Sequence, residues 1–343
     1  MEATSPQVDP KALAKAVAPF ETTEPWQGLL KFFMLLVPVV IGAKWLIFDS
    51  PDLLTMTLVT VPFAFVYASL LITTHDAIHT TLTGSKAFDE IAPRLISWPV
   101  YSIHSVYQEV HKLHHNMNGS NLNDPERVQY SVSEYESSSK PMKLFIRNQW
   151  FFNLFVFTGV GFIYKTAVFG ANFFKTSKTM RRAFFIDAFG IAIMNSIILT
   201  LAIIQDRIVY YGLWYFLTQY VVGFILQLRA HVEHYGLWGK GKNFYDTQVW
   251  NCRNMKVPYY VSWYFNFLSF HTIHHAFPRV PFYKLKEAQN AMRAVYEKSG
   301  LTIPESDLGY VKQSLILARN PVLIDDRKPQ LAGQSTILIS SLS

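Results

Sequence analysis

Charged residues and cysteine are both scarce in this sequence of 343 residues. Asp, Glu, Lys and Arg together make up 16% of the chain, whereas soluble domains average about a quarter. Half of the residues are hydrophobic, which excludes a disordered chain, a coiled coil and a collagen-like repeat. Cys252 is the only cysteine, so a disulfide framework and a cysteine-built zinc or iron–sulfur site are excluded. The composition favours one membrane-embedded unit over the two soluble domains that the length alone would allow.

Four segments are long and apolar enough to cross a bilayer as helices, which takes about 20 residues each. They are Leu30–Phe48, Leu53–Thr74, Phe184–Ile204 and Ile208–Leu228. Short polar turns join the first segment to the second and the third to the fourth. The sequence therefore predicts two transmembrane helical hairpins.

A fifth apolar stretch, Trp150–Val168, is interrupted by Gly159, Gly161 and a lysine, and we expect it to lie in the membrane interface. With four spans, all but two of the 31 Lys and Arg residues lie on the face that holds both termini, the exceptions being Lys44 and Arg207. Basic residues near span ends mark the cytoplasmic side. We thus interpret the net charge of +7 as a result of the membrane orientation of the chain. No nucleic acid is expected as a partner. The first 25 residues lack an apolar core, so no cleavable signal peptide is expected.

Ten of the eleven histidines fall into four tight clusters, and only His104 stands apart. Residues three and four apart share one face of a helix, and imidazole is the commonest metal ligand among side chains. No cysteine joins these clusters, which excludes soft-metal chemistry. The first cluster is His75 and His79; the second is His111, His114 and His115; the third is His231 and His234; the fourth is His271, His274 and His275.

Two spans separate the first two clusters from the last two, so all four are expected on the same face of the membrane. Nine or ten imidazoles are too many for one ion, whereas two ions with four or five nitrogens each and an open position fit the number. A site built from histidines alone at the membrane face favours a dinuclear iron centre that activates dioxygen. The predicted fold is all-α and membrane-embedded, with two hairpins and a cytoplasmic helical cap that carries the clusters.

One domain is expected, because the positive mean hydropathy and the few charges favour one membrane-embedded unit. Its predicted segments are a polar N-terminal segment (1–29), hairpin one (30–74), a region with the first two clusters and the interfacial stretch (75–183), hairpin two (184–228), a region with the last two clusters (229–320) and a tail (321–343).

This order of hairpins and clusters resembles the membrane fatty acid desaturase superfamily, the integral-membrane histidine-box di-iron oxidases. The match is carried by His75–His79, His111–His115 and His271–His275, and by the segment Ala276–Pro281 that follows them. It extends over most of the chain, from residue 30 to residue 290. The resemblance implies two irons and dioxygen, with no catalytic residue beyond the metal ligands. The ligands that it implies are His75, His79, His111, His114, His115, His271, His274 and His275.

The family usually adds one further histidine before the final cluster, and here His231 and His234 are both candidates, with His234 preferred. Gln227 and Asn266 are candidates for orienting a ligand or holding a water, against a local structural role. Asp76 is either an orienting partner or a helix cap, and Asp124 is either such a partner or part of a turn. Tyr260, Trp263 and Tyr264 are expected to line the substrate path, unless these aromatic residues form an interfacial belt.

The resemblance further implies oxidation of an unactivated C–H bond in a long acyl chain, most often to a double bond. The acyl carrier remains open between CoA, a carrier protein and a glycerolipid. A hydroxylase, ketolase or acetylenase acting on a carotenoid, an alkane or an acyl carrier is the alternative. The sequence holds no fused haem or nucleotide-binding segment, so an external ferredoxin or cytochrome b5 is expected as the electron donor. A metal transporter is disfavoured, because the predicted spans contain only Lys31, Lys44 and Asp187 as charged residues, all near span ends.

Overall fold

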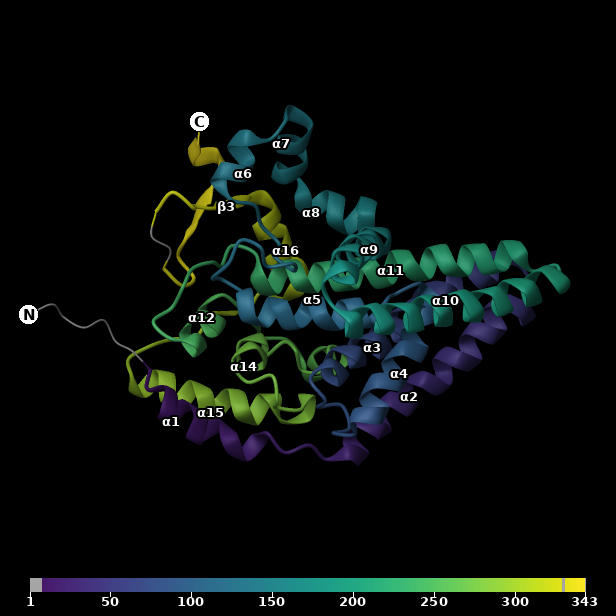
Figure 1. The fold of residues 1–343 in the computed structure, drawn as a ribbon, viewed down its shortest axis with the longest axis horizontal. Coiled ribbons are helices and arrows are strands. Elements are labelled where there is room, and N and C mark those ends of the chain that lie inside the picture. The colour runs from purple at the N-terminus through teal and green to yellow at the C-terminus, as the bar shows by residue number, and fades with distance from the viewer. Residues whose placement is uncertain (1–7, 329–330, 343) are drawn as a thin grey trace, which may run out of the picture. The chain divides into compact units, whose positions relative to one another are not determined.

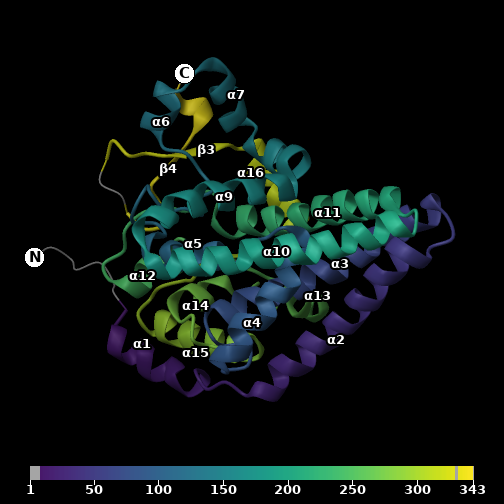
Figure 2. The ribbon, with the colours of Figure 1, turned by 45° about the vertical axis from the view of Figure 1, so that its right-hand side comes forward.

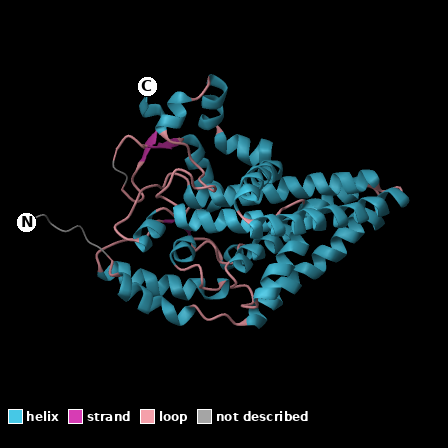
Figure 3. Cartoon of the chain, viewed as in Figure 1, coloured by secondary structure: helices cyan, strands magenta, loops and turns pink. Residues whose placement is uncertain are grey.

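The computed structural model describes residues 8–328 and 331–342, so the expectations for residues 1–7, 329–330 and 343 lie outside the described residues (Figure 1). The described chain is predominantly helical, and its strands are few and short (Figure 3). It divides into two compact units. We call residues 1–23, 111–152 and 228–343 the histidine-rich unit, and residues 24–110 and 153–227 the apolar unit.

The apolar unit contains both predicted hairpins. Its elements are α2 (Pro25–Lys44), the π turn η2 (Trp45–Asp49), α3 (Leu53–Ile78), α4 (Lys86–Ser97), the 3₁₀ turn η3 (Trp98–Val100), α9 (Thr158–Thr176) and α10 (Lys178–Ile204). Helices α5 (His104–Met117) and α11 (Ile208–His234) and the π turn η4 (Phe152–Phe157) each continue from one unit into the other. Helices α2 and α3 pack as one antiparallel pair, and α10 and α11 run side by side as the other (Figures 1 and 2).

Helix α3 begins at the polar turn that the sequence predicted between the first two spans. Asp52 is its N-cap, and the Asp52 carboxylate accepts a hydrogen bond from Thr55 N–H at 2.8 Å. Such a cap satisfies a backbone donor that would otherwise lack a partner at a helix start. The helix continues past Thr74, the expected end of the span, and its last turn contains the first histidine of the first cluster.

Among the described residues, five helices are long and apolar enough to cross a membrane, which is one more than the four predicted spans. The additional one, Gln149–Asn172, contains the stretch that we expected in the membrane interface. It consists of helical turns, but Thr158 has a φ of +39°, so the backbone departs from a regular helix directly before Gly159. Length and composition therefore allow five spans, and the count of four stays a prediction that depends on the charge distribution.

Gly159 lies at a close helix–helix contact. A Cβ atom placed on Gly223 of α11 would stand 1.8 Å from the Gly159 backbone nitrogen, and one placed on Gly159 would stand 2.5 Å from the Gln219 carbonyl oxygen. Small residues permit such backbone contacts between helices in a membrane. Gly159 is thus required by packing between α9 and α11.

Replacing Gly223 by alanine should lower the free energy of unfolding by about 1–3 kcal/mol, because the added methyl group meets backbone that cannot rotate away. The measurement is thermal unfolding of the detergent-purified protein. Gly212 is a matched control on the same helix, since a Cβ atom there meets nothing within 4 Å. Gly212→Ala should be neutral or stabilising by up to about 1 kcal/mol through helix propensity. Equal effects of the two variants would contradict the contact.

Asp187 of α10 lies fully buried in the apolar unit and accepts hydrogen bonds from three donors. Arg94 Nη1 and Trp98 Nε1 each donate to Asp187 Oδ1 at 3.0 Å, and Ser105 N–H donates to Oδ2 at 2.7 Å. A buried carboxylate is tolerated only when it is paired and hydrogen-bonded in this way. The one acidic residue of the predicted spans thus connects α4, η3 and α5 to α10.

The histidine-rich unit contains the remaining elements, which are mostly short. They are α1 (Pro10–Val17), η1 (Ala18–Phe20), α6 (Val132–Ser137), α7 (Lys140–Arg147), α8 (Gln149–Phe151), α12 (Phe244–Trp250), β1 (Asn254–Met255), α13 (Tyr259–Tyr264), α14 (His271–Ala276), η5 (Phe282–Lys284), α15 (Leu285–Lys298), β2 (Glu305–Ser306), α16 (Gly309–Arg319), β3 (Val322–Ile324), β4 (Thr336–Leu338) and η6 (Ile339–Leu342). Strand β1 pairs with β2 in parallel, and β3 pairs with β4 in antiparallel orientation.

Helix α14 is enclosed by other helices of the histidine-rich unit. It packs against α12 and α15, and α15 in turn packs against α1, close to the N-terminus (Figure 1). A separate small core of Val132, Tyr135, Ile146, Leu323 and Ile339 joins α6 and α7 to the C-terminal strands. Segments far apart in the sequence therefore surround the short helix that carries the fourth cluster.

Candidate metal centre

Helix α5 places the second histidine cluster on one buried face. His111, His114 and His115 stand at spacings of three and four residues, and all three are buried. The Nε2 atoms of His111 and His115 lie 3.0 Å apart. His104, the isolated histidine, is the first residue of the same helix and is also buried.

The fourth cluster lies on α14, whose first turn is held by polar contacts. Thr272 N–H donates to Asn254 Oδ1 at 2.9 Å. From this helix, His274 Nε2 lies 3.2 Å from His115 Nε2, and the His274 ring stacks on that of His111 with centroids 6.2 Å apart. We call His111, His115 and His274 the His111 set.

A second set of imidazoles gathers around the end of α11. His234 lies in the last turn of this helix, and its Nε2 atom is 2.8 Å from His271 Nε2. The ring centroids of His114 and His275 lie 4.8 and 4.9 Å from that of His234. All four side chains are buried. We call His114, His234, His271 and His275 the His234 set.

Cys252 lies beside the His234 set, so the expectation that no cysteine joins the histidines is wrong. Its Sγ atom is within 4.8 Å of ligand nitrogens of His234, His271 and His275. The cysteine is 18 residues from His234 in sequence, and it lies near because the backbone after α12 hydrogen-bonds to the last turn of α11. Burial raises the pKa of the Cys252 thiol well above its ordinary value, which keeps it protonated when no metal is near.

Two carboxylates hold the opposite ring nitrogens of two cluster histidines. His111 Nδ1 lies 2.7 Å from Glu126 Oε2, and His114 Nδ1 lies 2.9 Å from both carboxylate oxygens of Asp124. An ionised carboxylate only accepts hydrogen bonds, so Nδ1 of each ring carries the hydrogen. Each Nε2 atom therefore keeps the lone pair with which an imidazole binds a metal ion.

Gln248 of α12 holds a third ring, since its Oε1 atom lies 3.1 Å from His275 Nδ1.

The sequence offered two interpretations of Asp124, as a partner of a histidine and as part of a turn, and the structure contains both contacts. Asp124 contacts a histidine and also accepts a hydrogen bond from Glu126 N–H at 2.9 Å, as in a turn. Glu126 and Gln248 were missed, because neither belongs to a histidine cluster. The only available signal for Glu126 was its place in the loop directly after the second cluster.

The donor set fits a bound metal ion. Removal from water lowers the pKa of His111, His271 and His275 below the ordinary value, so these rings are neutral. Three pairs of Nε2 atoms lie 2.8–3.2 Å apart, a spacing at which two neutral rings either share one hydrogen or face a common cation. His275 Nε2 is fully buried and has no hydrogen-bond partner among the described residues. A metal ion would satisfy this nitrogen.

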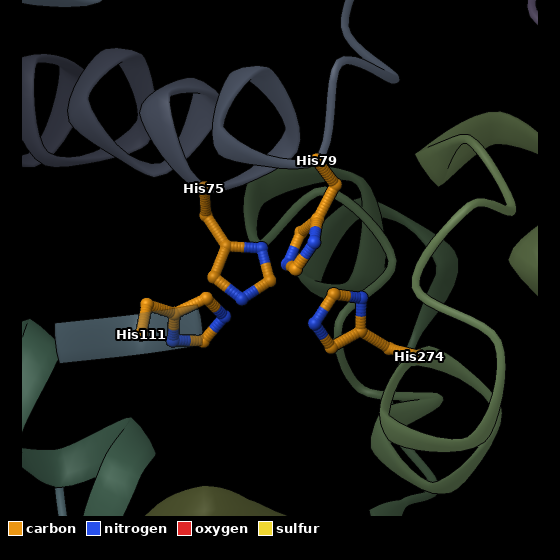
Figure 4. A group of neighbouring side chains, drawn as sticks. All are labelled: His75, His79, His111 and His274. Carbon is orange, nitrogen blue, oxygen red and sulfur yellow. The ribbon is translucent and has the colours of Figure 1, made fainter. Parts of the chain in front are cut away.

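The first cluster stands at the end of α3 in the apolar unit. His75 lies in the last turn and His79 directly follows the helix (Figure 4). Ligand nitrogens of the two rings lie within 4.8 Å of each other, and the rings meet edge to face. Asp76, which follows His75 in the sequence, is buried. It interacts electrostatically with Lys31 of α2. One helix end thus presents two imidazoles, as the spacing predicted.

The two histidines of the third cluster have different surroundings. His234 belongs to the His234 set, whereas the His231 ring stacks on Tyr235 with centroids 4.4 Å apart and planes 15° apart. Both are buried. The preference for His234 as the ligand stays a prediction that this difference supports.

The remaining candidate residues lie in three kinds of environment. Gln227 is half-buried on α11, and Asn266 is fully buried in a left-handed turn with φ of +52°. Trp263 and Tyr264 are half-buried on α13. Tyr260, at the start of that helix, is 71% exposed, which suits an interfacial aromatic residue better than the lining of a buried path.

Comparison with known proteins agrees with this arrangement. The family model described as "Fatty acid desaturase" matches residues 51–306, which include all four histidine clusters. A protein of Bacillus subtilis (strain 168) named "Fatty acid desaturase" is 25% identical over 301 residues, an alignment that covers 81% of this chain and 80% of the relative. The match confirms the resemblance on which the ligand assignments were based.

Proposed function

Because the chain belongs to the fatty acid desaturase family, we propose that it is a membrane-bound di-iron enzyme that introduces a double bond into a long fatty acyl chain. The observation that carries the proposal is the convergence of buried Nε2 atoms at 2.8–3.2 Å within the histidine-rich unit. The His111 and His234 sets together contain more imidazoles than one ion binds, which supports two ions.

The proposed ligands are the members of the two sets, together with His75 and His79, which the family resemblance adds. Imidazole nitrogens suit iron, and a bound iron pair would supply the activation of dioxygen that cleavage of an unactivated methylene C–H bond requires. No side-chain acid or base achieves that cleavage. Cys252 lies beside the His234 set, and the proposed ligands are the imidazoles because the family resemblance assigns the metal to histidines.

The chain's own residues orient the ligands and exclude water. Glu126, Asp124 and Gln248 each hold the Nδ1 atom of one imidazole, which fixes the tautomer and the direction of Nε2. Burial of both sets keeps bulk water away from the reacting atoms. We propose that the acyl chain passes along Trp263 and Tyr264 of α13, which would determine the carbons that react.

The proposed reaction needs an electron donor from outside the chain. The substrate loses two hydrogen atoms from adjacent carbons, and dioxygen takes these two electrons together with two from the donor and two protons, giving two waters. We propose a ferredoxin or a cytochrome b5 as the donor. The acyl group would arrive on CoA, on a carrier protein or in a glycerolipid. The distribution of basic residues supports a cytoplasmic site.

Metal analysis and product analysis together test the proposal. The detergent-purified protein should contain about two irons per chain, in accordance with the number of imidazoles. A host of known lipid profile that expresses the protein should acquire a fatty acid with one more double bond, detected by mass spectrometry. A hydroxylated or ketone product would assign the same site to a hydroxylase or ketolase. One zinc per chain without iron would contradict the di-iron centre.

A further inference from the structure

The loop between α5 and α6 contacts both histidine sets with two carboxylates that stand two residues apart. Its sequence Asp124-Pro125-Glu126 forms a turn in which Asp124 Oδ1 accepts a hydrogen bond from Glu126 N–H at 2.9 Å. The Asp124 side chain is almost fully buried, and that of Glu126 is mostly buried. Both carboxylates therefore point inward from one short segment.

The two carboxylates reach histidines of different sets. Glu126 holds His111, whose Nε2 atom converges with that of His115 in the His111 set. Asp124 holds His114, whose ring lies 4.8 Å from that of His234 in the other set. One turn of the chain thus contacts one member of each set.

The loop is itself held firmly on its far side. Gln129 makes two hydrogen bonds with one backbone turn after α11: its Nε2 donates to Leu237 O at 2.8 Å, and its Oε1 accepts from Gly236 N–H at 2.7 Å. Arg127 donates to both carboxylate oxygens of Glu134 at 2.7 and 2.6 Å. Bidentate contacts of this kind fix direction as well as distance. A loop held in this way can impose an orientation on the side chains that it contacts.

We propose that residues 121–129 act as a brace in which Glu126 is the positioning residue for the metal held by the His111 set and Asp124 is the positioning residue for the metal held by the His234 set. The proposal rests on the proposed two-metal function. The brace orients each imidazole through its Nδ1 hydrogen and leaves Nε2 aimed at the metal. One loop thereby contacts ligands of both metal positions, and each carboxylate orients the imidazole of one position.

Release of iron to a chelator from the purified full-length protein tests the brace without using activity. We expect two kinetic phases, one for each ion. His274→Ala identifies the phase of the His111 set, and His275→Ala identifies that of the His234 set. Glu126→Ala should weaken retention by about 10–100-fold in the first of these phases only, and Asp124→Ala should do so in the second only, as expected for the loss of a partner of a metal-bound histidine. The double variant should weaken both.

Asparagine and glutamine variants separate positioning from loss of folding. Asp124→Asn and Glu126→Gln keep an oxygen acceptor of the same shape, so their effects should be smaller than those of the alanine variants. Glu136→Gln is the matched control, since Glu136 lies on α6, is mostly exposed and pairs with Arg327 away from the histidines. It should leave both phases unchanged. Thermal unfolding of each metal-free variant shows whether the fold is retained.

Three outcomes would overturn the brace. Wild-type iron retention in folded Asp124→Ala and Glu126→Ala would show that the carboxylates position nothing. Weakening of the same phase by both variants, or of both phases by each, would contradict the division between the sets. A wild-type protein that binds fewer than two irons would overturn the proposed two-metal function and the brace with it, whereas failure of the variants alone leaves that function standing.

Discussion

Replacing His274 by alanine should abolish oxidation of the acyl chain and lower the bound iron by the ion of the His111 set. His274 Nε2 lies 3.2 Å from His115 Nε2, and its ring stacks on that of His111, so it stands where the Nε2 atoms of this set converge. Loss of a partner that only orients a metal-bound histidine lowers metal affinity by about 10–100-fold, and loss of a ligand itself should exceed about 100-fold. Iron content and fatty acid products of the purified and the expressed protein provide the two measurements.

His231 and His234 provide an internal comparison for this experiment. Both are buried histidines of α11, but only His234 has its Nε2 atom beside another imidazole nitrogen, whereas His231 stacks on Tyr235. His234→Ala should resemble His274→Ala, and His231→Ala should retain iron and oxidation. Normal iron content and normal oxidation in His274→Ala would contradict the di-iron assignment. If His231→Ala lost iron and oxidation while His234→Ala retained both, the ligand of α11 would be His231.

Replacing Arg94 by leucine should lower the free energy of unfolding by about 3–5 kcal/mol, the usual result of leaving a buried charge without its partner. Asp187 is fully buried, and Arg94 is its only cationic partner among the described residues. Trp98 and Ser105 would still donate to the carboxylate, but neither would neutralise its charge. Thermal or denaturant unfolding in detergent measures the effect.

Two further variants show whether the lost stability comes from the unpaired charge of Asp187 or from a general disturbance of α4. Arg94→Leu combined with Asp187→Leu should recover most of the lost stability, because apolar residues often replace a buried ion pair at little cost. Glu90 approaches Arg94 from the exposed side at 3.4 Å, so Glu90→Gln should change stability by no more than about 1 kcal/mol. If the double variant were as unstable as the single one, the unpaired charge would not be the cause.

Sequence spacing was sufficient to predict the helical hairpins and the histidine clusters. Apolar runs of about 20 residues and imidazoles three or four residues apart are local patterns, and a helix converts them directly into spans and shared faces. The fifth apolar helix shows the limit of this reasoning. Gly159 was interpreted only as an interruption, but it also permits contact with Gly223, and spacing along the sequence does not reveal that contact.

By itself, the sequence determined the family, the helical class and the four clusters of histidines, because these depend on composition and on spacing within single helices. Only the tertiary structure decided that Glu126 and Gln248 hold the rings of His111 and His275, that Cys252 lies beside the His234 set, and that Asp187 is neutralised by Arg94. Each of these contacts joins segments that no local period relates. They follow from how loops and short helices pack, where burial requires every charge and every ring nitrogen to have a partner.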